Sequence, residues 1–313
     1  MKLINSNYEI IEPVDYSLEN LYKFVELCGR VCYKSEDRIT SDSATKFIDR
    51  MIKSGHTSTL EHGTIYLYRE FDSNKLEEQD YHGWTQIYVN SPYSVISMMY
   101  RTDGIYQVFV TTNYRVIIEN GLDDDLKYMV DQPMDFHERR YTVRFIMDRI
   151  GSQSFCRHRH FSFSQESTRY CNYSKDKFDN EIKYIIPTWL DIPEGKYTYQ
   201  DGNWVDTDKM NMVSKSESRA SSFLFTLNHC EVMYNSLINQ GCKAQEARQV
   251  LPNALKTELI MTGFASDWEH FFSLRSNKYG RGGAHPDADK LATSLYEDFI
   301  SKNWISKINE NVE

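Results

Sequence analysis

The sequence predicts an α+β fold in which an antiparallel sheet is flanked by helices and the C-terminal part is helical. Three observations support this class. Two segments with helical spacing of apolar residues come early in the chain, residues 141–148 alternate at period two, and helical spacing dominates after residue 213. The 313 residues can bury a large core, as one domain or two closely packed ones.

The first 70 residues predict a strand, two helices and a second strand. Residues 1–12 are expected to form a short edge strand. A first helix is predicted from about 18 to 31 and a second from Ser41 or Ser43 to Gly55, because apolar residues recur there at helical spacing. Residues 64–70 then predict a strand.

Residues 71–139 predict an inserted excursion and not a domain of its own. Residues 71–104 are polar and rich in turn signals, 106–112 resemble a strand, and 116–118 fit a strand or a helix. The excursion has too few apolar residues for a separate core.

After the strand at 141–148, the second half of the chain is predicted to be mostly helical. The expected elements are a strand closing at Ile185–Pro187, a surface loop at 191–211, and helices at about 214–240, at 243–250, from the capping box Ser266–Glu269 and from His285–Pro286.

Charge and cysteine content limit the classes of partner. The formal charge is −9, so the protein as a whole repels nucleic acid and anionic membranes. No apolar run approaches the ~20 residues that span a bilayer, and Met1–Asn5 does not resemble a signal peptide. Six cysteines form no Cys-x-x-Cys pair, which is typical of a reduced, cytoplasmic protein.

One basic stretch, residues 156–170, stands out in this acidic chain. It places three arginines among hydroxyl and amide side chains, and guanidinium groups in such a setting can hold phosphate and polarise a carbonyl. A solvated basic turn and a nucleic-acid patch are the alternatives, and the net charge speaks against the second. The usual glycine-rich phosphate loops and the Gly-x-Ser-x-Gly elbow are absent from the sequence. Side chains must therefore hold any phosphate, and the candidates are Arg157, Arg169, Arg248 and Arg275.

The segment between the second helix and the strand at 64–70 carries His56, Glu61 and His62. These residue types can bind metals, but their spacing matches no zinc template. We therefore expect a hydrogen-bonding loop with no metal, and loops held between regular elements often carry function.

The basic stretch resembles the signature of flavin-dependent thymidylate synthases. Arg157-His158-Arg159 followed by Ser167-x-Arg169 matches the family pattern Arg-His-Arg-x(7)-Ser-x-Arg. Further blocks resemble the family in the expected order along the chain, namely Arg30–Tyr33, Gly55–His62, Glu246–Pro252 and Phe271–Arg275.

The resemblance implies a thymidylate synthase-complementing-protein-like fold, with 1–313 as a single domain and an insertion at about 71–139. It implies conversion of dUMP to dTMP with methylenetetrahydrofolate, NADPH and FAD, in a homotetramer with FAD at the subunit interfaces. No enzyme cysteine attacks the pyrimidine in this family, and the Pro-Cys-His motif of the other thymidylate synthases is absent here. Neither nucleic acid nor a membrane is an expected partner.

The resemblance also assigns roles to individual residues. Arg275 would be catalytic and polarise the pyrimidine ring. The expected dUMP contacts are Ser154, Arg157, Gln165, Glu166, Ser167, Thr168, Arg169, Arg248 and Arg275. The expected FAD contacts are His56, Ser58, Glu61, Arg157, His158, Arg159, Gln165 and His270.

The chain departs from the family pattern at several positions. Gln165 stands where an acidic residue is usual, Ser154 replaces a glutamine and His270 replaces a frequent asparagine. An Asn-x-Arg that commonly contacts FAD is replaced by Phe264-Ala265-Ser266. One alternative is a related flavin-dependent pyrimidine nucleotide hydroxymethylase, which would use the same nucleotide site. A non-catalytic nucleic-acid-binding protein is the alternative from another class, and the net charge speaks against it.

Overall fold

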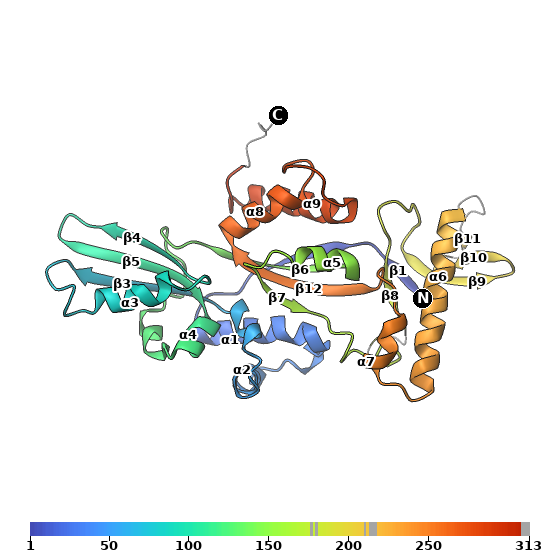
Figure 1. Ribbon diagram of the computed structural model, residues 1–313, viewed down its shortest axis with the longest axis horizontal. Coiled ribbons are helices and arrows are strands. Elements are labelled where there is room, and N and C mark those ends of the chain that lie inside the picture. Colours follow the sequence, from blue (N-terminus) through green and yellow to red (C-terminus); the bar gives the residue numbers. More distant parts are fainter. Residues whose placement is uncertain (176–177, 179–180, 210, 213–217, 308–313) are drawn as a thin grey trace.

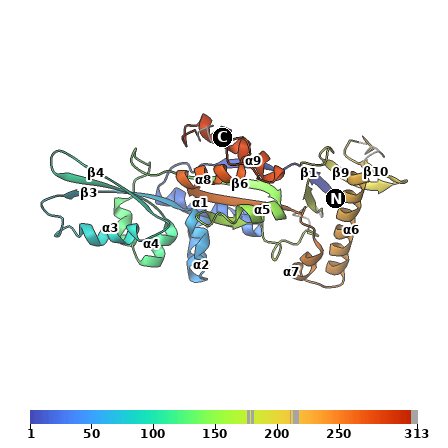
Figure 2. The same ribbon diagram turned by 45° about the horizontal axis from the view of Figure 1, so that its top comes forward.

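The computed structural model describes residues 1–175, 178, 181–209, 211–212 and 218–307. Three β-sheets lie side by side along the longest axis of the molecule (Figures 1 and 2). Their strand orders are β2-β6-β12-β7 in the central sheet, β3-β5-β4 in one flanking sheet and β11-β10-β9-β1-β8 in the other. Among the described residues, every pair of neighbouring strands is antiparallel except β1 with β8, so the mixed α+β class with antiparallel sheets is confirmed.

The strands are β1 (Lys2–Ile4), β2 (Asn7–Ile11), β3 (Thr64–Asp72), β4 (Val95–Tyr100), β5 (Ile105–Asn113), β6 (Arg140–Asp148), β7 (Ser162–Gln165), β8 (Lys183–Ile185), β9 (Gly195–Gln200), β10 (Asn203–Asp206), β11 (Asn211–Met212) and β12 (Lys256–Phe264). The helices are α1 (Leu18–Arg30), α2 (Ser43–Lys53), α3 (Tyr81–Val89), α4 (Tyr114–Asn120), α5 (Arg149–Phe155), α6 (Ser218–Asn239), α7 (Ala244–Ala247), α8 (Ala265–Arg275) and α9 (Pro286–Ser301). Short 3₁₀ helices cover Val31–Tyr33, Glu36–Arg38, Thr57–His62, Asp123–Tyr128 and Arg248–Val250.

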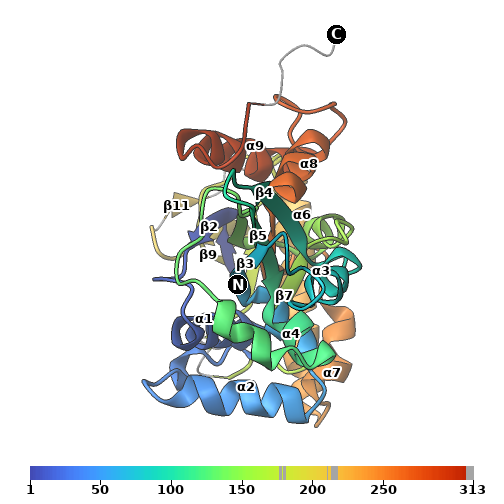
Figure 3. The same cartoon turned by 90° about the vertical axis from the view of Figure 1, so that its left-hand side faces the viewer.

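The central sheet separates two helical layers. Strands β6 and β12 pair along their whole length, from Arg140 opposite Phe264 to Asp148 opposite Lys256. Because side chains alternate across a strand, one face buries Phe145 among α8 and α9, and the other places Ile260 against α1. Figure 3 shows the two layers on opposite sides, with α8 and α9 above the sheet and α1 and α2 below it.

The β3-β5-β4 sheet shares its core with α1 and α2. Phe71, Trp84 and Tyr88 are buried in the same cluster as Val25 and Phe47. The segment 71–139 therefore packs against the N-terminal helices. It nevertheless carries more buried aromatic side chains than the sequence suggested.

The other flanking sheet packs against the long helix α6. Tyr184 of β8, Tyr197 of β9 and Trp204 of β10 are buried with Leu224 and Leu227 of the helix. Strand β1 lies between β9 and the edge strand β8 of this sheet.

Several predicted elements are confirmed. Helices α1, α2 and α9 and strands β3, β5, β6 and β8 lie where periodicity placed them, and residues 116–118 are helical. The helix predicted from about 214 is described from Ser218, and 214–217 lie outside the described residues.

Other predictions were wrong. Residues 71–104 contain α3 and β4, and the expected loop at 191–211 contains β9 and β10. Residues 1–12 form two strands in two sheets. The N-cap of α8 is Phe264, two residues before the expected Ser266, and the carboxylate of Asp267 accepts from the main-chain N of Phe264 at 3.1 Å.

Among the described residues, no helix is both long enough and apolar enough to cross a membrane.

Candidate active site

The basic stretch folds into β7 and the turn that follows it. The main-chain N of Ser167 donates to Cys32 O at 3.0 Å, and that of Cys171 donates back to Ser167 O at 2.9 Å. At the beginning of this turn, Nε2 of Gln165 donates to Oγ of Ser152 in α5 at 2.8 Å. Residues 165–171, called here the Ser167 turn, are thereby fastened to α5 on one side and to the end of α1 on the other.

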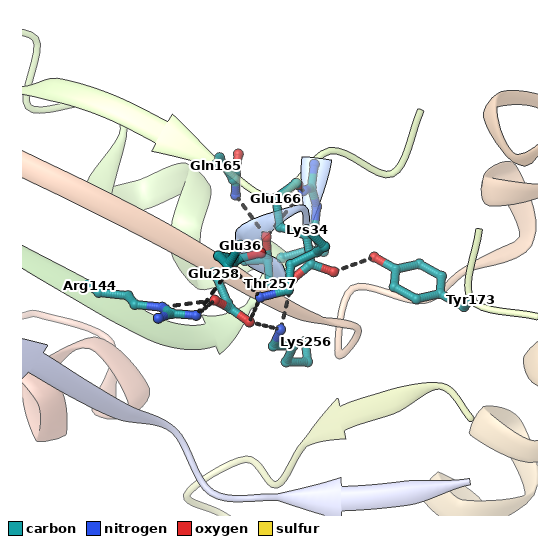
Figure 4. Close-up of polar contacts among 10 residues, drawn as sticks. Lys34, Glu36, Arg144, Gln165, Glu166, Tyr173, Lys256, Thr257 and Glu258 are labelled. Atoms are coloured by element: carbon teal, nitrogen blue, oxygen red, sulfur yellow. Dashed lines mark hydrogen bonds and ion pairs between the residues drawn. The ribbon is translucent and has the colours of Figure 1, made fainter. Parts of the chain in front are cut away.

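A network of six buried or half-buried charged side chains, one of them Glu166 of the turn itself, holds the Ser167 turn in place (Figure 4). Glu258 of β12 accepts from Lys34 Nζ at 2.8 Å, from Arg144 Nε at 2.8 Å and from Lys256 Nζ. Lys256 Nζ also donates to Glu166 Oε2 at 2.8 Å, and Lys34 Nζ donates to Glu36 at 2.9 Å. Three cations thus meet three carboxylates, and the network joins β6, β12 and the Ser167 turn.

The charges of this network fix the ionisation of Glu258. Burial alone would raise the pKa of its carboxyl group, but Lys256 and Lys34 outweigh that cost and lower the pKa to about 2. Glu258 is therefore a carboxylate throughout the physiological range. A buried carboxylate with several donors holds its neighbours in one geometry.

Glu166 belongs to this network and does not face solvent. It is 2% exposed, and its two carboxylate oxygens accept from Lys256 and, at 2.9 Å, from the hydroxyl of Tyr173. Its expected contact with dUMP stays a prediction, and such a contact would have to come from its main chain.

Arg248 reaches the Ser167 turn from a distant segment. Its Nη1 donates to Oγ1 of Thr168 at 3.2 Å. The neighbouring Arg169 is exposed, with its guanidinium 5.5 Å from the ring centre of Tyr170. Within the part of the chain that the structure describes, neither arginine has a carboxylate partner. Two guanidinium groups without carboxylate partners among the described residues, one on the turn and one beside it, suit a phosphate.

A second cluster forms where α5 meets the end of α8. Nε of Arg275 donates to Nε2 of His158 at 2.9 Å, and Nη2 donates to Ser154 O at 2.6 Å. The ring of His270 lies 6.1 Å from that of His158. Burial and then the charge of Arg157 lower the pKa of Arg275, which places Arg157 in the same electrostatic neighbourhood.

His158 is neutral in this cluster. Burial lowers its pKa to about 4, with further contributions from the charges of Arg275 and His270. Its Nε2 accepts from an arginine, so the proton of the neutral ring is assigned to Nδ1. The ring therefore acts as a fixed acceptor that orients the guanidinium of Arg275.

The 3₁₀ helix Thr57–His62 presents a mixed set of groups. His56 and Ser58 are exposed, whereas Glu61 is 8% exposed and accepts from Arg115 Nη1 at 2.6 Å. His62 is fully buried between the hydroxyls of Thr262 at 2.8 Å and Ser164 at 3.0 Å. Burial lowers the pKa of His62 to about 3, so it is a neutral hydrogen-bonding group. The hydrogen-bonding interpretation of His62 is thereby confirmed.

A cavity of about 460 Å³ lies between His56, the residue before this 3₁₀ helix, and Tyr170 of the Ser167 turn. Its walls include His56, Arg38 and Arg50 as well as the rings of Tyr33 and Tyr170, whose centres are 4.9 Å apart. Aromatic rings beside cations suit an aromatic ligand that carries negative charge.

The structure thus gathers the expected site residues into two clusters. Ser154, His158, His270 and Arg275 lie together with Arg157 nearby. Thr168 and Arg169 lie on the Ser167 turn, and Arg248 contacts that turn through Thr168. No hydrogen bond or ion pair between described residues joins the two clusters directly. Exposed Arg159 and Ser58 belong to neither.

Sequence reasoning missed the groups that hold the Ser167 turn. Lys34, Arg144, Lys256 and Glu258 belong to no motif. The charged residues that recur along β6 and β12 could have indicated this network. Strand β12 was not predicted, however, so its charged residues could not be matched with those of β6.

The sequence of this chain matches a known protein family. The family described as "Thymidylate synthase complementing protein" matches residues 14–135 and 126–302 of this chain. The matched regions contain both clusters and the β3-β5-β4 sheet.

Individual relatives are similar over part of the chain. A flavin-dependent thymidylate synthase from Geobacter sulfurreducens is 31% identical over 129 residues, which are 41% of this chain and 44% of that relative. One from Mycobacterium avium is 27% identical over 139 residues, 42% of this chain and 48% of that relative. The matches therefore span less than half the length of these curated relatives.

Among solved structures, a UMP/dUMP methylase from Streptomyces cacaoi bound to 5-Br dUMP aligns with 96% of this chain and 93% of its own. The TM-score is 0.42 and the sequence identity 16%.

Proposed function

The chain belongs to the thymidylate synthase complementing protein family, and from that premise we propose that it is a flavin-dependent thymidylate synthase. It would convert dUMP to dTMP with methylenetetrahydrofolate as carbon donor, NADPH as reductant and FAD as cofactor. The observation that carries the proposal is a set of arginines without carboxylate partners among the described residues. These are Arg157, Arg169, Arg248 and Arg275, two of them within the Arg-His-Arg and Ser-x-Arg signature.

The Ser167 turn is the proposed seat of the dUMP phosphate. Arg248 is positioned there by Thr168, and Arg169 is exposed beside it. The network around Glu258 keeps the turn in place while its own charges cancel, so it does not compete for the phosphate. Gln165 and Ser167 would add neutral hydrogen-bonding groups.

Arg275 is the proposed catalytic group. Its Nε and Nη2 are committed to His158 and Ser154, whereas Nη1 has no partner among the described residues. Nη1 can therefore donate to a carbonyl oxygen of the uracil ring. Negative charge that develops on that oxygen would be stabilised by a donor already oriented before the reaction. Arg157 would add positive charge at the same place.

The remaining residues suit a flavin nucleotide. Arg157 and Arg159 are exposed cations that fit a diphosphate, and His56 lies in a cavity walled by Tyr33 and Tyr170 that could take a ring. When bound, the flavin would supply the hydride chemistry. Ser58, Glu61 and His270 are proposed as further contacts, although the carboxylate of Glu61 is also held by Arg115.

The state of the cysteines supports a reaction without a thiol nucleophile. Burial raises the pKa of Cys28, Cys32 and Cys156, which keeps these thiols protonated at neutral pH. A protonated thiol is a poor nucleophile towards a pyrimidine ring.

The proposed oligomeric state and domain division of the chain are those that the resemblance to the family implies. We propose a homotetramer in which residues of different subunits complete one site. We propose that 1–313 is a single domain with an insertion at about 71–139. Six free cysteines support a reducing, cytoplasmic setting. Nucleic acid and membranes are not proposed as partners.

The proposal is tested by the flavin spectrum of the purified protein. The protein should carry FAD, and dUMP should perturb the flavin absorbance in a saturable way. The variant Arg248→Gln should keep the flavin and need roughly 10- to 100-fold more dUMP, as expected for loss of a charge-assisted phosphate contact. The matched control Arg101→Gln changes an exposed arginine of the β4–β5 hairpin and should behave as the wild type. A flavin-loaded protein whose spectrum ignores dUMP contradicts the proposed site.

A hydroxymethylase would use the same nucleotide contacts, and no contact among the described residues favours it. The mass of the product distinguishes dTMP from the hydroxymethyl nucleotide.

A further inference from the structure

Arg140, the first residue of β6, is a buried cation without a carboxylate partner. It is 5% exposed. Nη1 donates to Glu61 O and to Oγ1 of Thr64, both at 3.1 Å, and Nη2 donates to Oγ of Ser162 at 3.3 Å. All three acceptors are neutral, and no carboxylate of a described residue forms an ion pair with Arg140. A buried charge without a counter-charge is costly and requires an explanation.

The unused part of this guanidinium is its side-on edge. Nε has no hydrogen-bond partner, and Nη2 uses only one of its two hydrogens. In the same protein Arg144 holds Glu258 through Nε and Nη2, and Arg30 holds Glu26 through the same two atoms. Arg140 therefore offers an oxyanion the same two-pronged contact that these arginines give to carboxylates.

Arg140 also lines a cavity of about 560 Å³, which is in the range of small-molecule sites. The cavity lies between the loop after β2, the beginning of β6 and the chain after α9. Tyr16, Tyr141 and Trp304 contribute aromatic rings to its walls, and the last two stack with ring centres 4.1 Å apart. An aromatic or sugar ring could pack in such surroundings.

The net unpaired charge in this cavity is positive. Of the two carboxylates in its wall, Glu12 is paired with Lys302 at 3.0 Å, whereas Asp15 accepts from the main-chain N of Ser17 at 2.9 Å and keeps its negative charge. Arg139, which also lines the cavity, has no ion pair with any residue in the described ranges. A ligand with a phosphate would therefore meet two arginines without ion pairs and one carboxylate, Asp15, without an ion pair among the described residues.

We propose that this cavity binds the phosphorylated ribose of the nicotinamide cofactor, with the 2′-phosphate of NADPH on the side-on edge of Arg140 and on Arg139. The inference rests on the proposed function, which requires a reductant for which neither cluster provides a dedicated site. Arginine is the usual means of recognising a 2′-phosphate, and this sequence has no glycine-rich fingerprint to hold phosphate by its main chain. Arg140 also binds the main-chain oxygen of Glu61, a proposed flavin contact, so the cavity borders the proposed cofactor site.

Titration calorimetry with NADP⁺ and NAD⁺ on the flavin-loaded enzyme tests this assignment, because the two ligands differ only in the 2′-phosphate. The wild type should bind NADP⁺ more tightly. The variant Arg140→Met removes the charge and keeps a similar volume, so the fold should persist. It should weaken NADP⁺ binding about 10- to 100-fold, because a charge-assisted contact to the 2′-phosphate is lost. It should change NAD⁺ binding by less than about 3-fold. The control Arg101→Met should change neither affinity.

Two results would overturn the assignment. One is an unchanged NADP⁺ affinity in folded Arg140→Met, and the other is an equal loss for NADP⁺ and NAD⁺. If Arg140→Met does not fold, Arg139→Met serves instead, with an expected loss of NADP⁺ affinity of about 10-fold; an unchanged affinity there also overturns the assignment. This readout needs no dUMP, so its failure is separate from failure of the thymidylate synthase proposal, which shows as a flavin spectrum insensitive to dUMP.

Discussion

Arg275 and His158 share a hydrogen bond of 2.9 Å in which the arginine donates from Nε and the histidine accepts at Nε2. An arginine side chain offers donors only, so this contact requires Nε2 of His158 to carry no proton. The pKa of about 4 for His158 satisfies that requirement at neutral pH. The orientation of the proposed catalytic guanidinium thus depends on the ionisation of a neighbouring ring.

Replacing Arg275 tests its proposed role directly. A lysine keeps the positive charge but cannot hold His158, Ser154 and a substrate oxygen with one planar group. We expect Arg275→Lys to fold normally, to bind dUMP within a few-fold of the wild type and to lose about 100-fold or more in kcat, as for loss of a preorganised donor. Turnover and the dUMP-dependent flavin spectrum measure the two quantities.

The matched control for this variant is Arg281→Lys, which changes an exposed arginine beyond the end of α8. It should leave both quantities unchanged. An unchanged kcat in Arg275→Lys itself is incompatible with the activating role.

The lowered pKa of His158 predicts a pH dependence of stability. Between the usual histidine pKa near 6.5 and the folded value of about 4, the unfolded chain binds a proton that the folded chain does not. Stability is therefore complete above about pH 6.5 and falls as the pH decreases towards 4, by about 1–2 kcal/mol from this group. Denaturant unfolding of the wild type and of His158→Gln between pH 5 and 7 measures the difference, and the variant should show the weaker pH dependence.

His62 contributes in the same direction in both proteins, because its folded pKa is also lowered. The control His160→Gln removes an exposed histidine, and its free energy of unfolding should change with pH as steeply as that of the wild type. Equal slopes for the wild type and His158→Gln would show that His158 is not held neutral by the fold.

Much of the fold was predictable because amphipathic periodicity identifies elements with one buried face, as in α1, α2, β6 and α9. Strand β12 escaped because it is buried on both faces, so Leu259, Ile260 and Met261 show no alternation. The strands at 195–206 escaped for a different reason. Their glycine, aspartate and asparagine residues signal turns, while the buried rings of Tyr197 and Trp204 that hold them are separated in the sequence.

The candidate site was predictable in its motif residues only. The pairing of Arg275 with His158 joins segments 117 residues apart, and its geometry has no counterpart in local sequence. Arg140 could not be singled out for the same reason. Its lack of a counter-charge is a property of the folded surroundings and not of the Arg139-Arg140 pair as written.

The charge network beneath the Ser167 turn predicts a large effect of one substitution. Glu258→Gln removes the carboxylate that Lys34, Arg144 and Lys256 share, and it leaves three cations around a neutral amide. Breaking a buried ion pair at one partner costs about 3–5 kcal/mol, and we expect a loss of stability of that order. Denaturant unfolding provides the measurement.

Glu36 offers an internal comparison at the rim of the same network, where it is half-buried and accepts from Lys34. Glu36→Gln should cost no more than about 1 kcal/mol. Similar losses for the two variants would contradict the central position assigned to Glu258.

The contact between Arg248 and Thr168 predicts how the phosphate is held. Thr168→Val removes the hydroxyl that receives Nη1 of Arg248 at 3.2 Å and preserves the shape of the side chain. With its guanidinium less restrained, Arg248 should hold dUMP about 3- to 10-fold less tightly, the cost of about one hydrogen bond. The KM for dUMP should rise while kcat stays near the wild-type value. A fall in kcat alone would assign Thr168 to the chemistry and not to binding.

The central claim is that this chain methylates dUMP without a cysteine nucleophile. It is tested most directly by release of tritium from 5-tritiated dUMP with FAD, NADPH and methylenetetrahydrofolate present, comparing the wild type with Cys156→Ala, Cys32→Ala and Arg275→Lys. We predict tritium release and a product with the mass of dTMP in the wild type and both cysteine variants, and turnover lowered by about 100-fold or more in Arg275→Lys. Absence of tritium release from a flavin-loaded wild type, or loss of it in either folded cysteine variant, would contradict the account.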